Sequence, residues 1–331
     1  EIKECDWSSD VCSSDLGGSA HNAGSTEVDS LYGINHIDGT NYSDSIDASA
    51  DSTHGKYMDL MHGDDTGLGG GAADYIMGED GNDSIMGNGG DDTLNGELGS
   101  DTLDGGAHGS GGDWLSFELD EPTYGASVDL SNVDSLTGYS HAVVGSETDY
   151  VKNFENILGS SLADTLYGDS SANIIHGQEG NDYIAGNAGN DCLIGCMGAD
   201  TLYGGPGADT LVGGDGADVF HYDATSDGGA GERINDFVSG QDMISFNSSA
   251  FGNLEAGTLS EANYVTLADN SYAAGSNSLG TVNTPTFVFE ETSRNLYYDA
   301  DGAGGSSSAV MVAHVEGSPV EYTDIHIDAT A

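Results

Sequence analysis

Basic residues are almost missing from this sequence of 331 residues, in which five lysines and arginines face 57 aspartates and glutamates. The formal net charge of −52 repels a nucleic-acid backbone and an anionic membrane surface, so we expect neither as a partner. A chain this acidic also resists its own compaction unless something neutralises it. The shortage of positive charge therefore predicts a protein that needs a bound cation.

Residues 1–16 look foreign to the rest of the chain. The stretch from Asp6 to Leu16, DWSSDVCSSDL, is the translation of an oligonucleotide used as a sequencing-library adapter, and the residues before it fit the upstream part of that adapter. A segment of this origin is set aside before the fold is considered. We therefore exclude residues 1–16, and we expect the remainder to be the C-terminal part of a longer protein.

Cysteine, proline and long apolar runs are scarce as well. The chain has four cysteines and four prolines, and no apolar run is long enough to cross a membrane, so we expect no membrane insertion. Outside the excluded stretch only Cys192 and Cys196 remain, which gives no basis for a disulfide framework. We expect free thiols, with a strained disulfide between the two as the alternative.

Signatures of catalysis are also missing. The sequence has no His-Glu-x-x-His metalloprotease motif and no Gly-x-Ser-x-Gly nucleophile elbow, and its ten histidines share no ligand spacing. A phosphate-binding loop would need a lysine that the glycine-rich segments do not supply. We therefore predict no catalytic site in this chain.

Glycine and aspartate are abundant, and they recur in blocks of nine residues. A block opens with glycine, returns to glycine at the fourth place, and carries aspartate at the sixth and a large apolar residue at the eighth. Five consecutive blocks start at Gly177: GQEGNDYIA, GNAGNDCLI, GCMGADTLY, GGPGADTLV and GGDGADVFH. Two looser blocks start at Gly159 and Gly168, and the second of them has Asn173 at the sixth place.

An earlier array of the same kind begins at Gly69 with GGGAADYIM, GEDGNDSIM, GNGGDDTLN and GELGSDTLD. It leaves the period through an insertion before Asp113, and residues 39–47 upstream keep only a degenerate echo of it. Alternating apolar residues after each array predict further short strands. We divide the chain into a weak lead-in region with a degenerate repeat (17–68), a first array (69–115), a β-rich connecting segment (116–158), a second array (159–221) and a C-terminal cap (222–331).

The nine-residue period predicts a solenoid in which two blocks make one turn. Each block would form a glycine and aspartate loop followed by a three-residue strand whose middle side chain points inward, and stacked turns would bury a shared core. A solvated glycine-rich linker is the alternative, but it gives no reason for the apolar eighth place to hold through seven blocks.

Calcium takes six to eight oxygen ligands from carboxylates, carbonyls and water, and these loops offer the first two. We predict several ions, roughly three to five in the second array and roughly two or three in the first, each pinning adjacent turns. The predicted metal ligands are Asp74, Asp83, Asp92, Asp101, Asp113, Asp164, Asp182, Asp191, Asp200, Asp209 and Asp218.

The pattern resembles the RTX, or hemolysin-type, calcium-binding nonapeptide repeat GGxGxDxUx over residues 69–113 and 159–221. The tail, GADVFHYDATSDGGAGERINDFVSGQDMISF, resembles the C-terminal secretion region of serralysin-type proteins. The resemblance implies an all-β fold, the right-handed parallel β-roll, in two arrays. It also implies an extracellular, secreted protein that a type I secretion machinery exports unfolded and that folds in external calcium. The residues that depart from the motif are Ala72, Leu162, Ser171 and Asn173.

We interpret the chain as a calcium-dependent structural and secretion module. One alternative is the C-terminal fragment of a secreted RTX enzyme, such as a protease, a lipase or an alginate-modifying enzyme. Another is an adhesin or surface-layer component that binds extracellular polysaccharide. Candidate sugar-stacking residues for that alternative are Tyr75, Trp114, Tyr183 and Tyr203.

Overall fold

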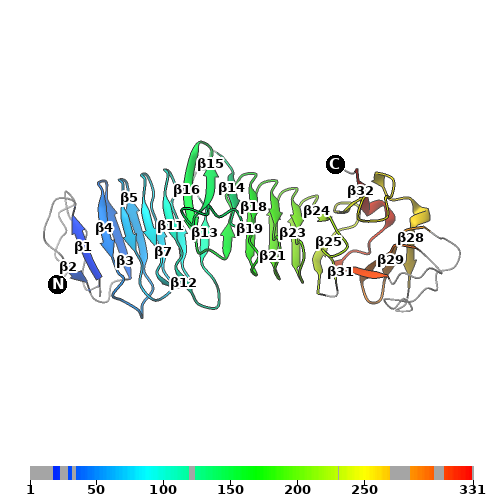
Figure 1. Ribbon diagram of the computed structural model, residues 1–331, viewed down its shortest axis with the longest axis horizontal. Helices are drawn as coiled ribbons and strands as arrows, with labels where there is room; N and C mark the ends of the chain where they lie inside the picture. The colour runs from blue at the N-terminus through cyan, green and yellow to red at the C-terminus, as the bar shows by residue number, and fades with distance from the viewer. Residues whose placement is uncertain are drawn as a thin grey trace. The chain divides into compact units, whose positions relative to one another are not determined.

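The computed structural model describes residues 18–22, 29–31, 35–118, 124–229, 231–268, 284–301 and 309–329 (Figure 1). These residues form short strands joined by glycine-rich loops, and their only helical elements are the 3-10 turns η1 (Glu261–Asn263) and η2 (Tyr322–Asp324). No described helix has the length and apolar character needed to span a membrane. The chain divides into two compact units, Glu1–Leu162 and Ala163–Ala331.

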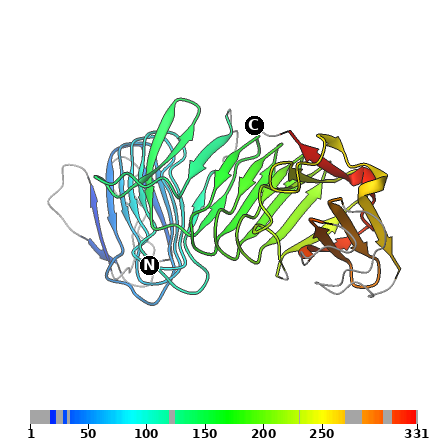
Figure 2. The ribbon, with the colours of Figure 1, turned by 45° about the vertical axis from the view of Figure 1, so that its right-hand side comes forward.

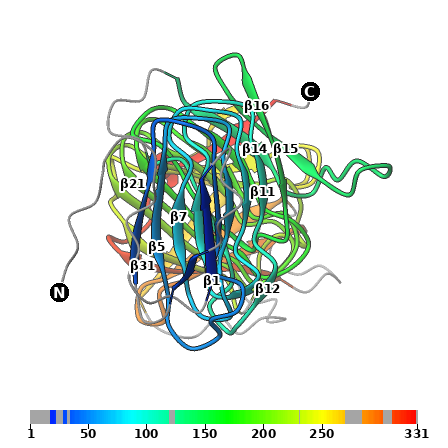
Figure 3. The same ribbon diagram turned by 90° about the vertical axis from the view of Figure 1, so that its left-hand side faces the viewer.

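The first unit winds through two parallel sheets (Figure 3). Each strand pairs with the strand one turn along the chain, so that Leu94 lies beside Ile76 on one side and Leu115 on the other. One sheet contains β4 (Asp44–Asp47), β6 (Thr66–Leu68), β8 (Ser84–Met86) and β11 (Thr102–Asp104). The other contains β3 (His36–Thr40), β5 (Tyr57–Met61), β7 (Tyr75–Met77), β10 (Thr93–Asn95), β13 (Trp114–Ser116) and β17 (Asn156–Leu158).

Strands from outside the repeat complete the first unit. β1 (Gly18–Asn22) pairs antiparallel with β4 and with β2 (Asp29–Leu31). The insertion before Asp113 supplies β12 (Ala107–His108), which pairs parallel with β9 (Gly89–Gly90) of an earlier block. The connecting segment supplies β14 (Ala126–Asp129), β15 (Ser140–Val144) and β16 (Glu147–Lys152), which pair antiparallel with one another, and β16 then continues the first sheet beside β11.

The second unit has the same construction, and Figure 2 shows its green strands side by side. One parallel sheet contains β18 (Thr165–Tyr167), β20 (Tyr183–Ala185), β22 (Thr201–Tyr203), β24 (Val219–Tyr222), β26 (Met243–Asn247) and β32 (Ile325–Asp328). The other contains β19 (Ile174–Glu179), β21 (Cys192–Met197), β23 (Thr210–Asp215), β25 (Arg233–Phe237) and β31 (Val310–Gly317).

The tail adds further strands to the end of the second unit. β30 (Asn295–Asp299) pairs antiparallel with β29 (Thr286–Glu290) and with β31, while β28 (Tyr264–Leu267) runs parallel to β29. β27 (Gly257–Thr258) pairs antiparallel with β32. Beneath these strands an aromatic cluster of Phe246, Phe251, Phe287 and Tyr298 closes the apolar interior.

The core of both rolls is the line of eighth-place side chains. They lie on strands of three to six residues, and none of them is more than 1% exposed. In the two arrays these residues are Ile76, Ile85, Leu94, Leu103, Leu115, Leu166, Ile175, Ile184, Leu193, Leu202, Leu211 and Phe220. The prediction of an all-β parallel β-roll is therefore confirmed.

The lead-in region is more regular than its sequence suggests. Although the repeat is degenerate there, β3, β4, β5 and β6 are in register with the turns that follow. Gly67 stands where the repeat has a large apolar residue, and a Cβ at Gly67 would lie 3.1 Å from Leu60 Cδ1. Leu60 of the neighbouring sheet thus fills the space that an eighth-place side chain leaves empty.

Candidate metal sites

The sixth-place residues form hydrogen-bonded ladders, two in each unit. The backbone N–H of Asp182 donates to Asp200 Oδ1 at 2.8 Å, and that of Asp200 donates to Asp218 Oδ1 at 3.0 Å. We call the members rungs. In the first unit the ladders are Asp44, Asp65, Asp83, Asp101 and Asp149, and Lys56, Asp74, Asp92, Asp113 and Glu155. In the second they are Asp164, Asp182, Asp200, Asp218 and Asp242, and Asn173, Asp191, Asp209 and Glu232.

All eleven aspartates predicted from the sequence are rungs, and none is more than 3% exposed. Their first carboxylate oxygen is satisfied by the ladder, but in most rungs the second is buried without any hydrogen-bond partner. The rungs with such an unpartnered Oδ2 are Asp65, Asp83, Asp92, Asp101, Asp113, Asp182, Asp191, Asp200, Asp209 and Asp218. A buried carboxylate oxygen without a donor is costly, so this row of atoms fits a row of cations.

The first-place glycines hold these unpartnered oxygens against the loop backbone. A Cβ at Gly195 would lie 2.2 Å from Asp200 Oδ2, a distance that no side chain tolerates. The fourth-place glycines allow neighbouring turns to stack closely. Gly198 has a φ of +144°, and a Cβ there would lie 1.3 Å from the carbonyl oxygen of Gly180. Both glycines of the block are therefore required by close backbone approach.

Burial sets the electrostatics of the rungs. It raises the pKa of Asp83, Asp92, Asp182 and Asp191 to about 7, from an ordinary value of 3.8. The pKa of Asp101 rises to about 8, through burial first and the neighbouring carboxylate of Asp149 second. Without a cation, the folded chain therefore holds these carboxylates in their charged form only at a cost in free energy.

The donor set is suited to a hard cation. Among the residues that the structure describes, no group of three or more His, Cys, Asp or Glu side chains is arranged to hold a metal ion. Neighbouring rungs are one strand spacing apart, about 4.8 Å, so an ion between two turns would meet one or two carboxylates and take its remaining ligands from loop carbonyls. Oxygen ligands of this mixture are those that calcium prefers.

Six acidic rungs were not predicted as ligands from the sequence. Asp44 belongs to the degenerate repeat at residues 39–47, and Asp65 lies in a block where Gly67 hides the period, although Asp65 stands 18 residues before Asp83. The others come from segments without any repeat and close the ladders: Asp149, Glu155, Glu232 and Asp242. No local signal distinguishes these four, because only strand pairing brings them to the ladder ends.

Asn173 departs from the motif without breaking the ladder. Its backbone N–H donates to Asp191 Oδ1 at 2.8 Å, and its side-chain Oδ1 accepts the backbone N–H of Asp169 at 2.9 Å. An asparagine therefore keeps the rung geometry while removing its charge.

A match to a family model agrees with this geometry. The model of the RTX calcium-binding nonapeptide repeat (4 copies) matches residues 68–103, 158–192 and 197–228. These segments are RTX calcium-binding repeats. The rungs that lie within these segments therefore belong to RTX repeats, and calcium is the ion that the family's description names.

Two solved structures are similar to parts of the chain. The extracellular lipase LipA from Serratia marcescens is 15% identical over 91% of this chain, with a TM-score of 0.26, and the match covers 44% of the lipase. A subunit of the Azotobacter vinelandii mannuronan C5-epimerase is 26% identical over 49% of this chain and 79% of its own, with a TM-score of 0.16. No curated protein sequence gives a significant match.

The remaining candidates from the sequence have structural explanations. Cys192 and Cys196 are free thiols on the single strand β21, as expected. Four residues of extended strand span roughly 13 Å, whereas a disulfide needs Cα atoms within about 7 Å. The disulfide alternative is therefore excluded.

The aromatic side chains proposed for sugar stacking pack largely against other rings. Tyr75 stacks on Tyr57 with ring centroids 5.4 Å apart and an interplanar angle of 3°, and Tyr57 stacks in turn on His36 at 4.6 Å. Tyr183 lies 5.6 Å from Tyr167 in a tilted arrangement. Ring faces that cover each other are not open to a sugar, so this geometry does not favour the polysaccharide alternative.

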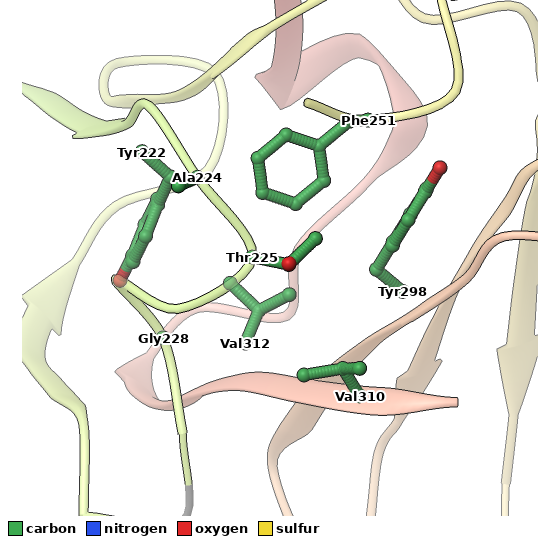
Figure 4. A pocket seen from close by; sticks show the side chains of 8 residues that line it. All are labelled: Tyr222, Ala224, Thr225, Gly228, Phe251, Tyr298, Val310 and Val312. Atoms are coloured by element: carbon green, nitrogen blue, oxygen red, sulfur yellow. The ribbon is translucent and has the colours of Figure 1, made fainter. Parts of the chain in front are cut away.

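A largely apolar pocket lies in the second unit (Figure 4), and the hydroxyl of its lining residue Tyr222 donates to Oε1 of the rung Glu232 at 3.3 Å. Its lining contains no acid and no histidine, which sets it apart from a metal site. The lining residues are Tyr222, Ala224, Thr225, Gly228, Phe251, Tyr298, Val310 and Val312.

Proposed function

We propose that the chain is a calcium-gated folding module, in which ions bound along the ladders turn a self-repelling coil into two rolls. One observation supports this above all, namely the row of buried carboxylate oxygens that lack any partner. When bound, calcium would neutralise these oxygens and tie neighbouring turns together. The residues proposed to hold it are the ten rungs with an unpartnered second oxygen, namely Asp65 and nine of the aspartates predicted from the sequence.

In the folded chain the ladder bonds orient the oxygens that would face the ion. A repeat carboxylate within a ladder accepts a backbone N–H of the previous turn, as in the 2.8 Å bond from Asp191 to Asp209. That bond orients the second oxygen of Asp209 toward the first-place glycine of its own block, Gly204, whose Cβ would lie 2.5 Å from it. The free energy of ion binding then becomes free energy of folding, since the unfolded chain lacks these pairings.

We further propose that the module belongs to a secreted, extracellular protein exported by a type I secretion machinery. Calcium is scarce inside cells and abundant outside, so a chain that folds only with calcium stays unfolded for export and folds on arrival. The net charge of −52 and the dominance of RTX repeats support this assignment.

Circular dichroism of residues 17–331 during a calcium titration of metal-free protein tests the calcium-gated fold. We expect a cooperative transition from coil to β structure with calcium, and none with magnesium as the control. A chain that is already fully folded in chelator, or one that remains a coil in millimolar calcium, would contradict the proposal.

A further inference from the structure

One rung of the first unit is a base instead of an acid. The backbone N–H of Lys56 donates to Asp74 Oδ1 at 2.6 Å, which is the bond that a sixth-place aspartate makes to the following rung. The strands that follow these two residues, β5 and β7, pair in register, with Tyr57 beside Tyr75. Lys56 therefore occupies the position of a repeat aspartate but carries the opposite charge.

The ammonium group of Lys56 is enclosed by oxygen atoms. Its Nζ lies 2.7 Å from Asp51 Oδ2 and 2.7 Å from the carbonyl oxygen of His54, and its side chain is 0% exposed. The other oxygen of Asp51 accepts the backbone N–H and the hydroxyl of Thr53. A carboxylate and a loop carbonyl around a buried positive charge are the same ligand types that calcium would receive elsewhere in the roll.

The neighbouring rungs leave no carboxylate oxygen to be neutralised at this end. The second oxygen of Asp74 accepts the backbone N–H of Gly70 at 2.5 Å. In the other ladder, Asp44 Oδ2 accepts both the backbone N–H and the hydroxyl of Thr40, at 2.6 and 2.9 Å. The unpartnered oxygens begin only with Asp65 and Asp92, one turn further along.

This part of the roll keeps a complete apolar core although Gly67 takes an eighth place. β5 is five residues long and turns both Met58 and Leu60 inward, each 0% exposed, whereas a three-residue repeat strand buries one large side chain. Ile37 and Ile46, each 1% exposed, complete the layer. Burial of apolar area stabilises this turn independently of any ion.

We propose that the Lys56 ammonium is a built-in replacement for calcium in the loop 51–56, and that residues 36–61 fold without calcium. The metal-dependent repeats of the first unit, whose dependence on calcium rests on the proposed function, would then assemble on this segment.

Hydrogen–deuterium exchange of the full chain, with metal stripped and chelator present, tests the proposal. We expect amides of residues 36–61 to be protected at least about tenfold more than those of residues 78–104. Lys56→Met should abolish this protection. Lys152→Met is the matched control, because Lys152 also pairs with an aspartate, Asp104 at 2.8 Å, but its side chain is 31% exposed and lies outside the segment. It should leave the protection unchanged.

Equal exchange of the two segments in the unaltered chain would overturn the proposal, as would full protection in the Lys56→Met variant. A second variant does not depend on stability in chelator. Lys56→Asp restores the acid of the repeat, and we expect it to bind one calcium ion more than the unaltered chain; an unchanged ion count would overturn the claim that the ammonium stands in for calcium.

Failure of the proposed function gives a different result. If calcium protects no amides in residues 78–104 or 164–218, the calcium-gated fold is wrong, whatever residues 36–61 do in chelator. If calcium protects those repeats while residues 36–61 exchange freely without it, only the role of Lys56 is wrong.

Discussion

At each rung the two carboxylate oxygens have separate tasks, because one accepts a backbone N–H and the other is left for an ion. Asp191 shows the division clearly: its Oδ1 accepts the N–H of Asn173 at 2.8 Å, and its Oδ2 is buried without a partner. A substitution can therefore remove the oxygen that would bind the ion and leave the oxygen that accepts the backbone N–H.

Asp191→Asn is the substitution that separates them. We expect calcium affinity at this rung to fall roughly tenfold or more, since a charged interaction is lost, while the Oδ1 atom of the asparagine can still accept the backbone N–H of Asn173. Calorimetric calcium titration measures the change. The control is Asp215→Asn, which removes an exposed acid outside the ladders. An equal loss in both variants would mean that only overall charge matters.

Gly195→Ala tests the close approach at the first place. The new methyl carbon would lie 2.2 Å from Asp200 Oδ2, so we expect a weakened ion site and a loss of about 1–3 kcal/mol in the free energy of unfolding in calcium. Urea denaturation gives the value. Gly229→Ala places its methyl in open space and should be nearly neutral. Comparable losses would assign the effect to glycine flexibility instead of to the rung.

The ladder residues show which parts of the candidate sites can be predicted from the sequence alone. The fixed spacing of nine identifies each repeat aspartate, because loop and strand geometry recur with the block. Lys56, Asp149 and Glu232 could not be found this way, since they enter the ladders through pairing of strands distant in sequence. That these aspartates bind calcium stays a prediction until ions are counted.

The three-residue strand with one inward side chain is the repeating element. Leu202 in β22 lies beside Ile184 of the previous turn and Phe220 of the next, and it is 0% exposed. Its contacts are shared between turns, so no single turn could bury it alone. The eighth-place pattern predicts such strands well, whereas the register of β14, β15 and β16 had no periodic signal to reveal it.

Leu202→Ala should therefore weaken the whole second unit in calcium. We expect the free energy of unfolding to fall by about 2–5 kcal/mol, because the cavity is flanked by packed side chains on both sides. The outward-facing neighbour provides the control, and Thr201→Ala should change stability by less than about 1 kcal/mol. Unfolding followed by tyrosine fluorescence compares the two; equal effects would contradict the assignment of Leu202 to the core.

On the scale of the whole molecule, proton and calcium should act in opposite directions. Burial raises the pKa of Asp65, Asp113, Asp209 and Asp218 to about 6, compared with 3.8 in an unfolded chain. Because a raised pKa means that the folded state holds its protons more tightly, the metal-free rolls are most stable in acid. They lose that stability as the pH rises through the folded values, from about 6 at these rungs to about 8 at Asp101.

We therefore expect metal-stripped protein to gain β structure when the solution is acidified from about pH 8 to about pH 5. Calcium affinity should fall over the same interval, because protons compete for the same oxygens. Circular dichroism in the absence of metal and calcium titrations at both pH values measure the two trends. Affinity that is independent of pH would show that the rungs with raised pKa do not take the ion.

The ladder bonds all point the same way, because each backbone N–H donates to the carboxylate of the rung that follows it in sequence. Each ladder therefore has a direction, and its two ends differ in the hydrogen-bonding groups that they leave open. At the C-terminal end of each ladder the last repeat rung has a backbone N–H without a further repeat carboxylate to accept it. Acids from non-repeat segments accept these N–H groups, namely Asp149 and Glu155 in the first unit and Asp242 and Glu232 in the second. Pairs of blocks, 18 residues at a time, can be gained or lost from the interior without disturbing either terminus. The number of repeats can therefore vary, whereas the segment that closes the C-terminal end of a ladder could not close its N-terminal end.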